Sequence, residues 1–98
     1  MVKFSKTQKF TKENIEKVPE NKAILYKIKN PKGENLYTGI AGRGRGQDRL
    51  LEHKELNREK IPGGTRFQYA QTKTKDRAEQ IEKQIIRKEH PEFNEKNK

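Results

Sequence analysis

The sequence predicts a small α/β protein of the α+β type, in which helices flank a three-stranded antiparallel sheet. Two patterns support this fold: three short segments alternate apolar and polar residues as strands do, and helical patterns lie between and after them. Length supports it as well, because 98 residues with 28% hydrophobic content can form one thin core but not two.

Residues 1–20 are predicted to be an N-terminal arm followed by a short helix. The first ten residues are polar and basic, so we expect a loosely attached arm that docks through Phe4 and Phe10. Thr11 is a suitable N-cap for a helix reaching about Val18, and Pro19 would end that helix.

The three predicted strands follow from residue alternation. Ile24, Tyr26 and Ile28 share one face of a strand over residues 23–29. Residues 30–34 have turn chemistry, and residues 35–40 form the second strand of a hairpin. Residues 61–64 interrupt the preceding helical pattern with proline and glycine. Phe67 and Tyr69 then alternate with polar neighbours in a third strand over residues 66–72.

Two longer helices are predicted around the last strand. A flexible basic loop over residues 42–46 leads into a helix from Asp48 to about Glu59. The final helix is expected to start with Asp76 as N-cap and Glu79 as its capping-box partner, and to end before Pro91. Residues 95–98 would be a polar tail.

Charge and composition restrict the possible partners. The 24 Lys and Arg residues exceed the 14 Asp and Glu residues, giving a net charge of +10 that favours a nucleic acid. A lysine-rich bias on solvated helix faces explains the charge equally well. The absence of cysteine excludes thiolate metal sites. Because no apolar run has the length of a membrane span, we expect no membrane partner and a cytoplasmic location.

Glu82 is the residue that packing does not explain. It falls within the apolar stripe of the last helix, which comprises Ala78, Ile81, Ile85 and Ile86. A buried carboxylate needs a cation, strong donors or water. A metal ion would meet this need, but from the helix alone an ion pair with a lysine or arginine at the margin of the stripe is favoured.

Four separated motifs resemble those of the GIY-YIG nuclease family. They are Ile24-Leu25-Tyr26, Tyr37-Thr38-Gly39, the Arg49-Leu50-Leu51-Glu52-His53 segment, and Glu82 followed by Ile85-Ile86 and Pro91-Glu92-Phe93-Asn94. The resemblance covers about residues 20–94, and the motifs occur in the family's order. The chain departs from the family in having Ile24 in place of a glycine, and Ile40 and Ala41 where a basic residue is common.

The resemblance implies a nuclease domain over residues 21–94 and a role for each motif residue. Glu82 would bind Mg²⁺ or Mn²⁺, and Arg49 would bind the scissile phosphate. Tyr26 would be the general base, while Tyr37 and His53 would position water or relay protons. Arg43 and Arg45 are expected to bind nucleic acid with Arg49, and either is a hypothetical substitute for the missing basic residue.

Simpler structural roles are also open for several of these residues. The two tyrosines can be packing residues of strands, and His53 can be a solvated helix residue. Asn94 is more simply explained by backbone hydrogen bonds that tie the chain end to the core than by contact with substrate.

The function implied is a metal-dependent endonuclease that hydrolyses DNA phosphodiesters in repair or recombination. With no residues left for another domain, we expect limited sequence specificity or a separate specificity partner. DNA is preferred over RNA on the resemblance alone. Two alternatives stay open: a non-catalytic nucleic-acid-binding module, and the nuclease tip of a larger toxin.

Overall fold

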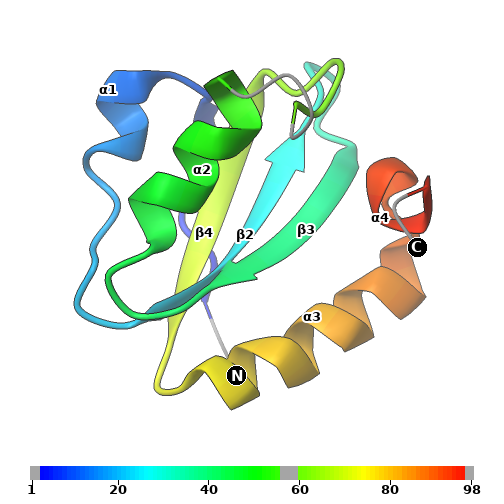
Figure 1. The fold of residues 1–98 in the computed structure, drawn as a ribbon. Coiled ribbons are helices and arrows are strands. Elements are labelled where there is room, and N and C mark those ends of the chain that lie inside the picture. Colours follow the sequence, from blue (N-terminus) through cyan, green and yellow to red (C-terminus); the bar gives the residue numbers. More distant parts are fainter. Residues whose placement is uncertain (1–2, 56–59, 97–98) are drawn as a thin grey trace.

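The computed structural model describes residues 3–55 and 60–96, so that residues 1–2, 56–59 and 97–98 lie outside the description (Figure 1). Its elements in chain order are β1 (Gln8–Lys9), α1 (Lys12–Ile15), β2 (Ala23–Lys29), β3 (Asn35–Ala41), α2 (Gly46–Glu55), β4 (Arg66–Thr72), α3 (Lys75–Glu89) and α4 (Glu92–Lys96). The predicted α+β class is confirmed.

The sheet has four strands, in the order β1-β4-β2-β3, and every neighbouring pair is antiparallel. The predicted strands at residues 23–29, 35–40 and 66–72 are all present, with β3 reaching Ala41. Tyr26 in the central strand β2 pairs with Gly39 on one side and Tyr69 on the other. Leu36 is the extra residue of a bulge, because Ile28 pairs with Tyr37 and Lys29 with Asn35.

The fourth strand corrects the expectation of a loosely attached arm. Gln8 and Lys9 pair with Phe67 and Arg66 as β1. Phe10 is buried against Phe67, with ring centroids 5.7 Å apart, and Lys27 Nζ lies 4.8 Å from the centre of the Phe4 ring. The docking through phenylalanines is confirmed, and it brings the arm's backbone within pairing distance of the sheet edge.

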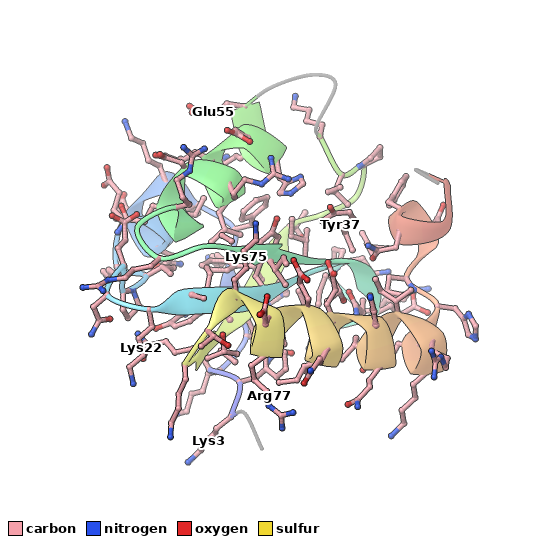
Figure 2. All side chains as sticks on the ribbon, turned by 60° about the horizontal axis from the view of Figure 1, so that its bottom comes forward. Lys3, Lys22, Tyr37, Glu55, Lys75 and Arg77 are labelled. Atoms are coloured by element: carbon pink, nitrogen blue, oxygen red, sulfur yellow. The ribbon has the colours of Figure 1, made fainter. Side chains whose placement is uncertain are left out.

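Helices cover both faces of the sheet. Figure 2 shows α1 and α2 on one side and α3 on the other. Ile24, Tyr26 and Ile28 are fully buried in the core on the α1–α2 side. Leu25, on the opposite face of β2, is fully buried as well, because α3 packs across β2 and β3. The central strand therefore lacks a solvated face.

The first two helices differ in their limits from the prediction. Thr11 caps α1 by accepting a hydrogen bond from the Asn14 N–H, but the helix ends at Ile15 rather than near Val18. The Val18 N–H bonds to the Ile15 carbonyl three residues back, which tightens the last turn out of α-helical geometry. Helix α2 begins at Gly46 rather than Asp48, and the predicted extension over residues 56–59 lies outside the described residues.

The start of α3 also corrects the prediction. Thr74, not Asp76, is the N-cap, and its hydroxyl accepts a hydrogen bond from the Arg77 N–H at 3.1 Å. The expected capping box of Asp76 and Glu79 is therefore wrong. Moving the cap by two residues leaves the Glu79 carboxylate available for contacts along the helix.

The C-terminal segment returns to the sheet edge. Helix α3 ends before Pro91, as predicted, and α4 packs on β3 where a polar tail was expected to begin. Asn94 Oδ1 accepts from the Thr38 N–H at 2.7 Å, and Asn94 Nδ2 donates to the Thr38 carbonyl at 2.9 Å. The prediction that Asn94 ties the chain end to the core is confirmed. Within residues 3–55 and 60–96, every helix is too short or too polar to cross a bilayer.

Candidate active site

Tyr26 and Gly39 face each other across the β2–β3 pair. A Cβ atom at Gly39 would lie 2.5 Å from the Tyr26 hydroxyl oxygen, so only glycine leaves space for the tyrosine ring at this position. The Gly39 of the Tyr37-Thr38-Gly39 motif thus has a local physical explanation. It allows the ring to lie against the backbone of the edge strand.

The Tyr26 hydroxyl is hydrogen-bonded to His53 of α2. The oxygen lies 2.8 Å from His53 Nε2, and both side chains are buried, at 0% and 3% exposure. The Tyr37 ring packs against the same imidazole in a tilted arrangement, with the ring centroids 4.8 Å apart. The alternative that His53 is a solvated helix residue is wrong, because helix α2 turns it into the core.

Arg49 lies one turn before His53 on α2 and forms an ion pair with Glu52. About a third of the Arg49 side chain is exposed. Although partial burial lowers the pKa of Arg49, the neighbouring Tyr26 hydroxyl and Glu52 carboxylate together raise it above its ordinary value. The guanidinium therefore stays charged at the boundary between the buried ring cluster and solvent.

Burial dominates the ionisation of Tyr26. Desolvation raises the pKa of its hydroxyl far above the ordinary value, and Tyr37 raises it further. Arg49 lowers this pKa through its charge and a hydrogen bond, while Glu82 raises it. The expectation that nearby cations lower the pKa of Tyr26 is therefore outweighed, and the hydroxyl stays protonated at neutral pH.

Glu82 projects from the face of α3 that also carries Lys75, Glu79 and Ile86, which recur at about 100° per residue. Its side chain is half-buried. Burial raises the pKa of the Glu82 carboxyl, the nearby Glu79 raises it further, and Lys83 lowers it. No ion pair joins Glu82 to a lysine or arginine within residues 3–55 and 60–96. The ion-pair alternative is thus not found in this part of the chain.

A cleft of about 310 Å³ opens beside this cluster, between the end of β3 and the first turns of α2 and α3. We name it the Arg49 cleft. It is lined by Ile40, Ala41, Gly42, Arg45, Arg49, Lys75 and Glu79. Lys75 extends over the end of β3, where its Cδ would be 4.0 Å from a Cβ at Gly42. Three cations and one carboxylate therefore meet in a single concave surface.

Most of the predicted site residues lie close together, as one cluster of contacting side chains with a carboxylate of α3 nearby. Tyr26, Tyr37, Arg49 and His53 form one contact cluster, and Glu82 lies near enough to influence the ionisation of Tyr26. Arg45 lines the Arg49 cleft. Arg43 is exposed and is not among the residues that line this cleft.

Sequence reasoning did not identify Lys75 and Glu79 as site residues. Both occupy the cleft, and both share a helix face with Glu82. The signal was present in their spacing, since residues four and three apart on a helix are neighbours. It was missed because Glu79 was assigned to a capping box that does not form.

The donor set of the site is small. Glu82 and Glu79 provide hard carboxylate oxygens one turn apart, which suits an oxygen-preferring divalent cation completed by water and phosphate oxygens. Within the described part of the chain, no group of three or more His, Asp or Glu side chains lies in position to hold a metal ion. Any divalent ion here would therefore depend on few protein ligands.

No family model matches the chain, and no curated protein matches it either.

Proposed function

We propose that this protein is a metal-dependent endonuclease that hydrolyses phosphodiester bonds in DNA. The observation that supports this most is the contact of Arg49, which lines a cationic cleft, with the buried Tyr26 hydroxyl that is hydrogen-bonded to His53. The half-buried carboxyl of Glu82, without an ion-pair partner among the described residues, is its second support.

Phosphodiester hydrolysis adds the oxygen of a water molecule to phosphorus and breaks one P–O ester bond. The water loses a proton, charge develops on the phosphoryl oxygens, and the departing alkoxide gains a proton. Arg49, with Arg45 and Lys75 beside it, would bind those phosphoryl oxygens in the cleft. Arg49 would exchange its Glu52 partner for the phosphate.

Tyr26 is better suited to relay a proton than to act as a base that ionises in advance. Its raised pKa keeps the hydroxyl protonated. As the hydroxyl oxygen accepts a proton from water, its own proton can pass to His53 Nε2, 2.8 Å away. This exchange leaves Tyr26 neutral and requires an imidazole whose Nε2 is unprotonated. Tyr37 would hold the imidazole in place through its tilted ring contact.

Glu82 would hold the divalent cation, with Glu79 as a further oxygen donor. When bound, Mg²⁺ or Mn²⁺ supplies Lewis-acid stabilisation of phosphoryl charge and lowers the pKa of its water. A positive ion would also stabilise the ionised form of Glu82, which burial and Glu79 oppose.

DNA is proposed over RNA on the motif resemblance, together with limited sequence specificity of the chain's own. The described residues make one small fold, with principal extents of 30, 30 and 24 Å. Such a surface can contact only about one turn of duplex, at about 3.4 Å per base pair. Few base pairs are therefore within its reach for sequence recognition. A separate specificity partner would extend it.

A non-catalytic nucleic-acid-binding module is the second candidate. The observations that favour it are the Arg49–Glu52 ion pair, which occupies the phosphate-binding guanidinium, and the strongly raised pKa of Tyr26. A binding module needs cations but gains nothing from Glu82, whose carboxylate repels phosphate. This residue therefore separates the two candidates.

The test compares the wild type with Glu82→Gln and with Glu13→Gln as a matched control. Glu13 is an exposed residue in the first turn of α1, so its substitution makes the same charge change away from the cleft. Each protein is incubated with supercoiled plasmid, a branched duplex and a structured RNA, in Mg²⁺, in Mn²⁺ and in chelator. Metal-dependent DNA cutting by the wild type and the Glu13 variant, lost in Glu82→Gln while binding persists, is the expected result. Salt-sensitive binding by all three proteins without any cutting would support the binding module instead.

A further inference from the structure

A second concave surface lies on the far side of the first turn of α3 from the Arg49 cleft. It has a volume of about 760 Å³, and we name it the basic cavity. It is lined by Lys3, Lys22, Gln71, Thr72, Lys73, Thr74 and Arg77. Four of these seven residues are cations and none is a carboxylate, which makes the cavity more uniformly positive than the cleft.

The neutral residues of the basic cavity bond to the protein itself. Thr72 Oγ1 donates to the Thr74 carbonyl at 2.8 Å, and the Thr74 hydroxyl accepts from the Arg77 N–H. Gln71 Nε2 donates to Asn21 Oδ1 at 2.9 Å. These hydrogen bonds hold the neutral lining residues in place, so the shape of the cavity does not depend on a ligand.

The cations of the cavity are not neutralised by carboxylates. No ion pair joins Lys3, Lys22, Lys73 or Arg77 to an Asp or Glu within residues 3–55 and 60–96. Arg77 donates to Gln80 Oε1 at 3.3 Å, a neutral acceptor that leaves its charge uncompensated. Four like charges around one hollow repel one another, and an anion would relieve that repulsion.

Helix α3 places the basic cavity beside the cleft. Lys75 and Glu79 line the cleft, whereas Arg77, two residues from Lys75 and about 200° further round the helix, lines the cavity. Figure 2 shows Lys75 above the first turn of α3, Arg77 and Lys3 below it, and Lys22 to its left. The N-terminus of this 15-residue helix lies between them, with its partial positive charge. The first turn of α3, which also carries the acidic Asp76, therefore separates two hollows that are each lined by cations.

We propose that the basic cavity binds the phosphodiester backbone of DNA that flanks the phosphate held in the Arg49 cleft. The choice of DNA as the polyanion rests on the proposed function. The cations come from four separate segments: the N-terminal arm, the residue before β2, the β4–α3 connection and α3 itself. This spread suits successive phosphates along a strand better than one small anion, which needs convergent donors.

The test is the salt dependence of DNA binding, measured in chelator so that no cutting occurs. A triple variant, Lys22→Gln with Lys73→Gln and Arg77→Gln, is compared with a control triple, Lys12→Gln with Lys17→Gln and Lys32→Gln. All six residues are exposed, both variants lose three charges, and none of the control residues lines the cavity. The probe is a fluorescent hairpin whose stem of about 12 base pairs, at about 3.4 Å each, exceeds the 30 Å extent of the molecule.

Each lost phosphate contact lowers the slope of log K against log salt by about 0.9. The cavity variant should therefore lose about 2 to 3 units of slope, and the single Lys73→Gln variant about 1, while the control triple changes by less than 1. Equal slopes for the two triple variants would overturn the proposal. Thermal unfolding midpoints that agree between the triples would show that the difference is one of binding.

Failure of the cavity proposal can be distinguished from failure of the endonuclease proposal. If the wild type cuts no substrate but the cavity variant still loses slope relative to the control, the basic cavity stands as a backbone site and the endonuclease assignment falls. If the wild type cuts and the two triples bind alike, the endonuclease assignment stands and the cavity proposal falls. A further measurement adds inorganic phosphate as a competitor at constant ionic strength. Displacement of the hairpin by phosphate at low millimolar concentration would instead indicate a small-anion site and overturn the backbone assignment.

Discussion

The hydroxyl oxygen of Tyr26 lies against the backbone of Gly39, so close that a Cβ at Gly39 would be 2.5 Å from it. This contact fixes the position of the tyrosine ring against the backbone of β3. The hydroxyl is thereby placed for its 2.8 Å hydrogen bond to His53. One glycine on the edge strand thus positions the buried end of the proposed site.

We predict that Gly39→Ala displaces Tyr26 and lowers both stability and DNA cutting. The added methyl group overpacks a ring with no space to move, a change that costs about 1–3 kcal/mol. The free energy of unfolding in urea measures it. Gly42→Ala is the control, because a Cβ there meets nothing closer than Lys75 Cδ at 4.0 Å. Equal stability of the two variants would contradict the prediction.

Tyr26→Phe is predicted to destabilise the protein by about 1–3 kcal/mol at neutral pH, because buried His53 Nε2 loses its partner. The pH dependence follows from the raised pKa of Tyr26. Tyrosine ionises in the unfolded chain near its ordinary pKa but not in the fold, so stability is full below that pKa and is lost as pH rises above it. Alkaline titration at the phenolate absorbance should find a tyrosine that ionises only on unfolding. Tyr69→Phe, from the part-buried tyrosine of β4, should retain that late step, and its loss there would contradict the assignment.

Glu82→Gln is predicted to stabilise the fold at neutral pH while abolishing cutting. Burial, followed by Glu79, raises the pKa of Glu82, so its ionisation costs folding free energy. A raised folded pKa means that the wild type loses stability as pH rises through that pKa, a loss that glutamine lacks. The advantage of the variant should therefore disappear at acid pH. Unfolding midpoints measured from acid to neutral pH would show it, and a constant difference across that range would contradict it.

Glu89→Gln, on the same helix, is predicted to change stability in the opposite direction. Although burial raises the pKa of Glu89, hydrogen bonds from Asn35 and Lys27 and the charge of Lys27 lower it overall. A depressed folded pKa gives stability that is present above the unfolded pKa and is lost as pH falls through the folded pKa. Because Glu89 itself is exposed to solvent, the loss at neutral pH should be at most about 1 kcal/mol. The same pH series measures it, and stabilisation at neutral pH would refute the prediction.

Asn94→Ala is predicted to loosen the C-terminal segment from β3. It removes both hydrogen bonds to the Thr38 backbone and leaves a buried N–H without its acceptor, at a cost of about 1–3 kcal/mol. The stability of Asn94→Asp should lie between those of the wild type and Asn94→Ala, because aspartate still accepts from the Thr38 N–H but cannot donate to the Thr38 carbonyl. Hydrogen exchange of the Thr38 amide follows the effect directly. Unchanged protection in the alanine variant would show that this amide has another partner.

Local patterns determined much of the fold. Alternation located β2, β3 and β4, and Thr11 and Pro91 marked helix limits correctly, because these signals depend on neighbours within one turn or one strand. The errors occurred where distant residues decide. Strand β1 is too short to show a period and forms because Phe10 packs against Phe67, more than fifty residues later.

The motifs were enough to point to Tyr26, Tyr37, Arg49, His53 and Glu82 as the residues of the proposed chemistry. The surroundings of these residues come from the fold. It buried Tyr26 and His53 together, brought Lys75 and Glu79 into the Arg49 cleft, and divided the cations between a cleft and a cavity on either side of α3. The reason is physical: residue type and spacing fix a side chain's chemistry and its face, but desolvation and electrostatics arise from neighbours that only folding brings near.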